Sequence, residues 1–274
     1  MERAPVVAGR FYPGSPLQLN YEIENYLNAN ISSGEVKKPW AVMLPHAGYM
    51  FCGDIIGKTL ANIALPQNLV ILCPNHTGMG LPLGVWAEGS WQTPLGAVPV
   101  NKKLAAELIN THTGFHADPL SHLREHSIEV LLPFLQKKVP SLSIVPVCVG
   151  VHNAAILENA AKGLAMTIKS MPGDIGIVVS SDMNHYENEK TTFAKDQLAL
   201  NAILANDPDG LLETVAKNNI SMCGAAPMAL ALYTAKILGN IRAQLIAHDS
   251  SARASGDHEH TVGYAGMDLF LEYY

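Results

Sequence analysis

Apolar runs and amphipathic segments alternate along most of this 274-residue chain. Apolar residues spaced three or four positions apart predict helices over residues 17–27, 54–64, 101–110, 120–138, 154–170, 192–205, 208–217 and 224–238. Short continuous apolar runs predict strands over residues 40–44, 68–73, 142–149, 174–180, 241–247 and 262–271. Residues 78–100 are rich in Gly, Pro and Trp, which indicates short strands or a long loop. Pro133 is expected to bend or split the helix that contains it.

This alternation of strands and helices predicts an α/β protein. Such a chain forms a mainly parallel or mixed central sheet with helices on both faces. The hydrophobic content of 48% is enough for a substantial core. No internal repeat, low-complexity tract or composition break divides the sequence, so we expect a single domain over residues 1–274.

Charge and cysteine usage exclude several classes of protein. The net charge is −6 and no run of Lys or Arg is present, which argues against a nucleic-acid partner. The N-terminus lacks the apolar core of a signal peptide, and no apolar stretch is long enough to span a membrane. The four cysteines, Cys52, Cys73, Cys148 and Cys223, are far apart and form no CxxC pair. They are typical of reduced thiols, so we expect a cytoplasmic protein.

Chemically capable side chains follow three of the predicted strands. His46 follows the run 41–45, His76 follows 69–75, and Asp182 and His185 follow 175–181. In open α/β sheets, ligands bind beyond the carboxyl ends of the strands. Histidine is also the commonest ligand of transition metals in proteins. The sequence therefore predicts one pocket that contains these four side chains, with a metal site as one interpretation and capping or core histidines as the other.

Asp182, His185 and Cys223 suggest further chemistry. Asp182 could pair with His185 and fix its tautomer, as in general-base catalysis or behind a metal ligand. A Ser/His/Asp hydrolase is disfavoured, because no Gly-x-Ser-x-Gly elbow is present. Cys223 precedes a long apolar helix, whose dipole would lower the pKa of the thiol. Local sequence leaves open whether Cys223 is functional or structural.

The remaining histidines and cysteines are ambiguous or are assigned structural roles. His126 and Glu129 would share one face of the helix predicted over 120–138, either on a pocket wall or as a solvated ion pair. The acidic and histidine residues of the stretch 249–260 fit a metal site, although ordinary loop composition is the simpler interpretation. Four other histidines are expected at the surface: His112, His116, His122 and His152. Three cysteines are expected to be buried, unreactive thiols: Cys52, Cys73 and Cys148.

Several motifs together resemble those of the Memo family, and the opening segment resembles its prokaryotic branch, AmmeMemoRadiSam system protein B. In chain order they are Pro5–Pro13, Pro45-His46-Ala47-Gly48-Tyr49 with Cys52-Gly53, Pro74-x-His76, Glu125-His126-Ser127-Ile128-Glu129, Ser180-Ser181-Asp182-x-x-His185, Cys223-Gly224-x-x-Pro227 and Gly263-Tyr264-Ala265. The resemblance covers essentially the whole chain.

This resemblance implies a fold similar to the LigB-type class III extradiol dioxygenases, which are non-haem iron enzymes. It implies a metal site at His46, His76 and Cys223, with Asp182, His185 and His126 around it. The dioxygenases use two histidines and a carboxylate, whereas this chain offers a thiolate, so ring cleavage is not carried over. Fe(II) is the preferred metal, with copper or zinc as alternatives. The family label also implies radical-SAM and AMMECR-type protein partners.

Three classes of function follow as hypotheses. The first is a redox enzyme that acts on a small molecule with oxygen, in which His185, Asp182 and His126 are the catalytic residues. The second is a non-catalytic metal-binding, redox-regulating or partner-binding protein of the AmmeMemoRadiSam system. The third is a hydrolase with Cys223 as nucleophile and His185 as base.

Overall fold

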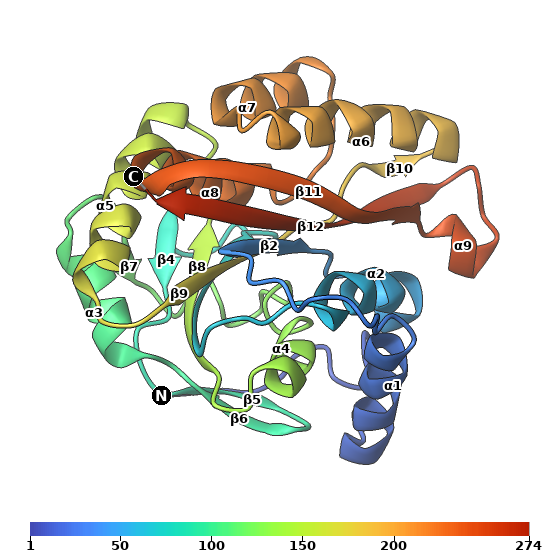
Figure 1. Cartoon of the computed structure of the whole chain (residues 1–274), viewed down its shortest axis with the longest axis horizontal. Coiled ribbons are helices and arrows are strands. Elements are labelled where there is room, and N and C mark those ends of the chain that lie inside the picture. Colours follow the sequence, from blue (N-terminus) through green and yellow to red (C-terminus); the bar gives the residue numbers. More distant parts are fainter. Residues whose placement is uncertain (274) are drawn as a thin grey trace.

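Four parallel strands form the centre of the computed structural model, which describes residues 1–273 (Figure 1). They lie in the order β2 (Ala41–Leu44), β9 (Ile175–Ser180), β3 (Asn68–Pro74) and β8 (Ser143–Val149). Their registers align Leu44 with Ser180 and Cys73 with Cys148. The carboxyl ends of these strands therefore meet at one edge of the sheet.

Antiparallel strands extend this centre on both sides. Next to β2 lies β12 (Thr261–Tyr273), which also pairs with β11 (Gly239–Ser250) and β10 (His185–Glu187). Next to β8 lies β4 (Leu83–Val85), followed by β7 (His116–Ala117). A second small sheet contains β1 (Glu2–Arg3), β5 (Ser90–Thr93) and β6 (Gly96–Pro99). The mixed sheet within a single α/β domain confirms the predicted fold class.

Helices cover both faces of the large sheet. One hydrophobic cluster joins Val70 and Leu72 of β3 to α3 (Lys102–Asn110), α5 (Ala154–Ser170), α7 (Pro208–Lys217) and α8 (Ala225–Leu238). A second joins Leu69 and Ile71 to α1 (Pro16–Asn28), α2 (Tyr49–Ala61) and α4 (Leu132–Lys138). Both faces of β3 are buried, and its sequence is accordingly apolar from Leu69 to Pro74 instead of alternating. The remaining helices are α6 (Glu189–Leu204) and α9 (Ala252–Ser255).

The helix predicted over 120–138 is wrong in its first half. Turns, bends and irregular backbone occupy residues 120–131, and α4 begins only at Leu132. Side chains of this segment point into the protein, where Glu125, Ser127 and Glu129 are fully buried. The Glu125 and Glu129 carboxylates and the Ser127 carbonyl accept hydrogen bonds from distant parts of the chain, which hold the segment in this non-helical path.

Two other expectations need correction. His122 was expected at the surface but is fully buried, with its ring edge-on to Trp86 and Trp91. The helix predicted over residues 54–64 begins five residues earlier, at Tyr49, and Gly48 caps it with an ordinary φ of −61° and ψ of 143°.

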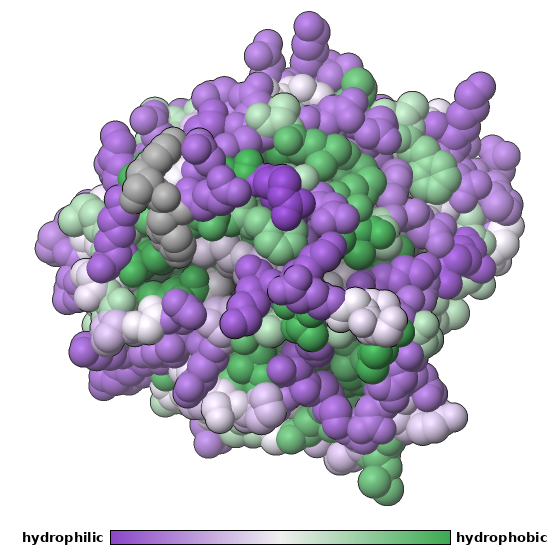
Figure 2. Space-filling view, viewed as in Figure 1, coloured by the Kyte–Doolittle hydropathy of each residue, from purple (hydrophilic) through white to green (hydrophobic). Residues whose placement is uncertain are grey.

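Hydrophilic residues cover most of the face seen in Figure 2, with hydrophobic residues grouped between them. Within residues 1–273, no helix combines the length and the apolar character needed to cross a membrane.

Candidate metal centre

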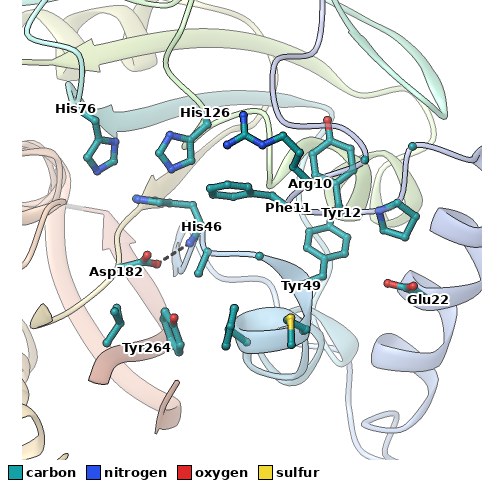
Figure 3. A pocket seen from close by; sticks show the side chains of 18 of the residues that line it. Arg10, Phe11, Tyr12, Glu22, His46, Tyr49, His76, His126, Asp182 and Tyr264 are labelled. Atoms are coloured by element: carbon teal, nitrogen blue, oxygen red, sulfur yellow. Dashed lines mark hydrogen bonds between the residues drawn. The ribbon is translucent and has the colours of Figure 1, made fainter. Parts of the chain in front are cut away.

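The strand ends converge as predicted on one cavity. This cavity has a volume of about 810 Å³, and His46, His76, Asp182 and His185 all contribute to its wall. Figure 3 shows His46, His76 and His126 gathered at one end, with Asp182 below them. Cys223, which comes from the turn before α8, contacts His46 at the same end.

Hydrogen bonds fix the tautomer of His46. Its Nδ1 lies 2.7 Å from Oγ of Ser180, and that hydroxyl donates its own hydrogen to the carbonyl of Ser127 at 2.8 Å. Ser180 can therefore only accept from His46, so the proton sits on Nδ1 and Nε2 carries the free lone pair. Burial lowers the pKa of His46 well below its ordinary value, helped by the neighbouring His76 and His126. The neutral ring is the form that binds metals.

Glu125 orients His76 in the same way. Its carboxylate accepts from Nδ1 of His76 at 2.9 Å and from the backbone N–H of His76 at 2.7 Å. Burial alone would lower the pKa of His76, but the hydrogen bond and charge of Glu125 outweigh it and raise that pKa. Burial likewise opposes ionisation of Glu125, yet His76 and Ser127 hold the pKa of this carboxyl at about 2. A carboxylate behind a histidine fixes the ring and makes it a stronger ligand.

Cys223 completes the group because a glycine follows it. A Cβ at Gly224 would lie 2.3 Å from Cβ of Ser181, so only glycine lets this turn approach the end of β9 so closely. The Cys223 sulfur lies 3.4 Å from Nε2 of His46 and accepts from the N–H of Asp182 at 3.2 Å. Burial raises the pKa of the Cys223 thiol, and the Asp182 carboxylate raises it further. The lowered pKa expected from the helix dipole is therefore wrong.

The donor atoms of His46, His76 and Cys223 all lie within 4.8 Å of one another. Nitrogen and sulfur atoms that share one tetrahedral ion at ordinary bond lengths lie roughly 3.5 Å apart. The 3.4 Å between Nε2 of His46 and the sulfur of Cys223 matches this spacing. The arrangement can therefore hold one metal ion with small adjustments of His76.

A second group, His76, Glu125 and His126, has donors equally close. Glu125 is a poorer ligand, because its two oxygens already accept from Nδ1 and N–H of His76 and from N–H and Oγ of Ser127. Its geometry is that of a residue that positions His76.

Asp182 and His185 do not form the predicted pair. The carboxylate of Asp182 accepts from the N–H of His46 at 2.8 Å, and burial raises its pKa. Nδ1 of His185 instead donates to the carbonyl of Ser221 at 3.1 Å, and the backbone N–H of His185 donates to the Ser221 hydroxyl. Because a carbonyl can only accept, Nδ1 of His185 carries the hydrogen of this bond.

His126 lies on the cavity wall but is separated from Glu129. Its ring stacks on His76 with centroids 5.0 Å apart and meets Phe11 edge-on at the same distance. Glu129 points away from the cavity and binds Arg3 at 2.8 Å. The predicted face shared by His126 and Glu129 therefore does not exist, because the segment that contains them is not helical.

Sequence reasoning missed the residues that orient the ligands. Ser221 lies in no motif, and Ser180 appears only within the motif Ser180-Ser181-Asp182-x-x-His185, which assigns it no role. Glu125 directly precedes His126 but was not assigned a role. Arg10 and Phe11 lie in the motif Pro5–Pro13, but only tertiary packing brings them to the cavity wall.

Comparisons with known proteins place the whole chain in one family. The sequence model of a family described as Memo-like protein matches residues 3–268. This chain belongs to the Memo family. Its relatives include MEMO1 family proteins of Thermotoga petrophila, 39% identical over 98% of this chain and 100% of the relative, and of Thermotoga neapolitana, 41% identical with the same coverage. A MEMO1 family protein of Methanopyrus kandleri is 34% identical over 97% of this chain and 98% of its own length.

Proposed function

We propose that this Memo-like protein binds one redox-active metal ion through His46, His76 and Cys223. The convergence of their donor atoms within 4.8 Å is the observation that carries the proposal. Both rings are oriented from behind, His46 by Ser180 and His76 by Glu125, so that Nε2 of each is available as a ligand. Such pre-orientation is typical of metal sites.

Fe(II) is the proposed metal, and copper and zinc are the alternatives. The preference for iron rests on the resemblance to non-haem iron dioxygenases, because two imidazoles and a thiolate also suit copper and zinc. A bound cation would also stabilise the Cys223 thiolate, although burial raises the pKa of the metal-free thiol. An iron or copper ion would supply one-electron chemistry and open coordination positions at this site.

We propose an oxygen-dependent oxidation of a small molecule as the reaction class. The residues around the three ligands are suited to proton handling. Ser221 binds Nδ1 of His185, so Nε2 is the ring atom left to exchange a proton on the cavity wall. Asp182 lines the same cavity, and burial raises its pKa, which favours a carboxyl that exchanges a proton. His126 is the third residue proposed to handle protons. Burial lowers its pKa, which favours the neutral ring.

Metal analysis of anaerobically purified protein tests the ligand set. We expect about one ion per wild-type chain and loss of that ion in His46→Ala, His76→Ala and Cys223→Ser. His152→Ala is the matched control, because this exposed histidine lies outside the cavity. Full occupancy in all three ligand variants would overturn the proposal.

A metal-binding or metal-delivery protein without turnover is the second candidate. The thiolate ligand favours it, because this is where the chain departs from the dioxygenase ligand set. Oxygen consumption by the Fe(II)-loaded protein that is lost in His185→Ala, with metal content unchanged, would support the enzyme. Stoichiometric transfer of the ion to a chelating acceptor without oxygen consumption would support the second candidate.

A further inference from the structure

The N-terminal strap, defined here as residues 4–14, forms the wall of the cavity opposite the candidate ligands. Buried Glu129 holds it in place: its carboxylate accepts from the N–H groups of Val6 and Val7 and from the Tyr12 hydroxyl, each at 2.9 Å. The carbonyl of Phe11 in turn accepts from the N–H of Tyr49 at 2.8 Å. The strap is therefore a fixed part of the cavity.

The strap presents a positive charge to the cavity. Figure 3 shows the side chain of Arg10 running past Phe11 toward His126. Among the described lining residues, Arg10 is the sole Arg or Lys. Within residues 1–273 its guanidinium has no ion-pair or hydrogen-bond partner, unlike Arg3 and Arg253. A guanidinium keeps its charge at all physiological pH values and binds carboxylates through two parallel N–H groups.

An apolar surface accompanies this charge. Phe11 lies beside Arg10 on the strap, and Tyr186 of β10, far away in the sequence, lines the same cavity. Tyr186 has a φ of 64°, in the left-handed region, and lies at an irregularity in the pairing of β10 with β12. Its side chain remains 79% exposed. A strained backbone that holds an aromatic ring exposed at a pocket is typical of a binding residue.

We propose that the cavity binds a small organic monoanion, whose carboxylate pairs with Arg10 and whose apolar body contacts Phe11 and Tyr186. A single negative charge fits best, because the cavity wall also contains the carboxyl groups of Glu22 and Asp182. The opposite end of such a molecule faces His46 and His76, so the anion is the substrate class of the proposed reaction. This last step rests on the proposed function, but recognition of the carboxylate by Arg10 does not.

Ligand-observed NMR titration of metal-free protein with benzoate and its neutral counterpart benzamide tests the proposal. Benzoate should bind the wild type more tightly than benzamide does. In Arg10→Gln the affinity for benzoate should fall about tenfold or more, the usual effect of losing a charged hydrogen-bonding partner. The affinity for benzamide should not change. Arg242→Gln, which removes the same charge outside the cavity, should bind both as the wild type does.

Tyr186→Gly should weaken benzoate and benzamide alike, because it removes an apolar contact and leaves Arg10 in place. Equal affinity of the wild type for the two ligands, absence of benzoate binding, or unchanged binding in Arg10→Gln would each overturn the proposal. Metal content distinguishes this failure from that of the proposed function. Arg10→Gln should retain the ion that His46→Ala, His76→Ala and Cys223→Ser lose.

Discussion

Two buried carboxylates, four residues apart on the same segment, have different surroundings. Glu129 lies between Arg3 and the N-terminal strap, where donors of both surround its oxygens. Arg3 is equally well bound: it donates to the carbonyls of His122 and Glu125 and lies 4.0 Å from the centre of the Trp91 ring. Glu125 instead holds His76, whose ring extends from this support into the cavity.

The difference teaches how to separate structural from functional buried polar groups. In the Glu129 cluster the charges of Glu129 and Arg3 neutralise each other, and both groups bind only protein atoms. In the Glu125 cluster the chain of hydrogen bonds ends at His76, whose metal-binding nitrogen lies within 4.8 Å of the nitrogen of His46 and the sulfur of Cys223. Buried polar groups are costly unless they are paired, so metal-binding atoms gathered at the end of such a chain of hydrogen bonds mark a candidate ligand site.

Replacing Glu129 should produce the largest effect and should act on stability. In Glu129→Ala the buried guanidinium of Arg3 loses its counter-charge, and three donors of the strap lose their acceptor. We expect the free energy of unfolding to fall by about 3–5 kcal/mol. Urea denaturation measures this loss of stability. Glu24→Ala is the control, because Glu24 forms an ion pair with Lys137 at the surface, where such pairs contribute little. A loss no larger than in the control would contradict a structural role of this cluster.

Acidification should also destabilise the Glu129 cluster, through His122. Burial lowers the pKa of His122 to about 4, and the nearby Arg3 contributes. The unfolded chain takes up this proton near pH 6.5, before the folded chain does, so stability should decline as the pH falls from about 6.5 to 4. The difference between the unfolded and folded pKa values of His122 corresponds to a loss of about 3 kcal/mol in the free energy of unfolding over this pH range.

Unfolding of wild type and His122→Gln at pH 7, 5.5 and 4 measures this contribution. The stability of the variant relative to the wild type should rise toward acid pH, and parallel curves would refute the assignment. His76 should affect the pH dependence of stability in the opposite direction, because its pKa is raised in the folded protein. Its contribution to the stability of the metal-free protein is present at low pH and is lost as the pH rises through that pKa.

The smallest effect is expected at Glu125 and should act on metal affinity. Glu125→Gln keeps the size of the side chain but removes the charge that orients His76. Comparable changes behind a ligating histidine weaken metal binding by about 10–100-fold. Competition with a chelator of known affinity measures the change, and Glu24→Gln is the control. Complete loss of the ion from Glu125→Gln, with full occupancy in Cys223→Ser, would move the site to His76, Glu125 and His126.

The sequence predicted the architecture because local patterns reflect burial. The apolar run of β3 and the amphipathic pattern of α5 each depend on which side of the element faces the core. The histidines after β2 and β3 could be placed at one edge, because parallel strands bring their carboxyl ends together. The partners of these histidines could not be placed in the same way.

By itself the sequence determined the α/β class, the positions of most helices and strands, and the meeting of His46, His76 and Asp182 at one end of the sheet. Only the tertiary structure decided which atoms these residues present. It paired His185 with Ser221 instead of Asp182, buried His122, and turned residues 120–131 away from a helix. The physical reason is that hydrogen bonds depend on atoms within about 3 Å, whatever their separation in the chain, whereas hydrophobic periodicity is a local property of the chain.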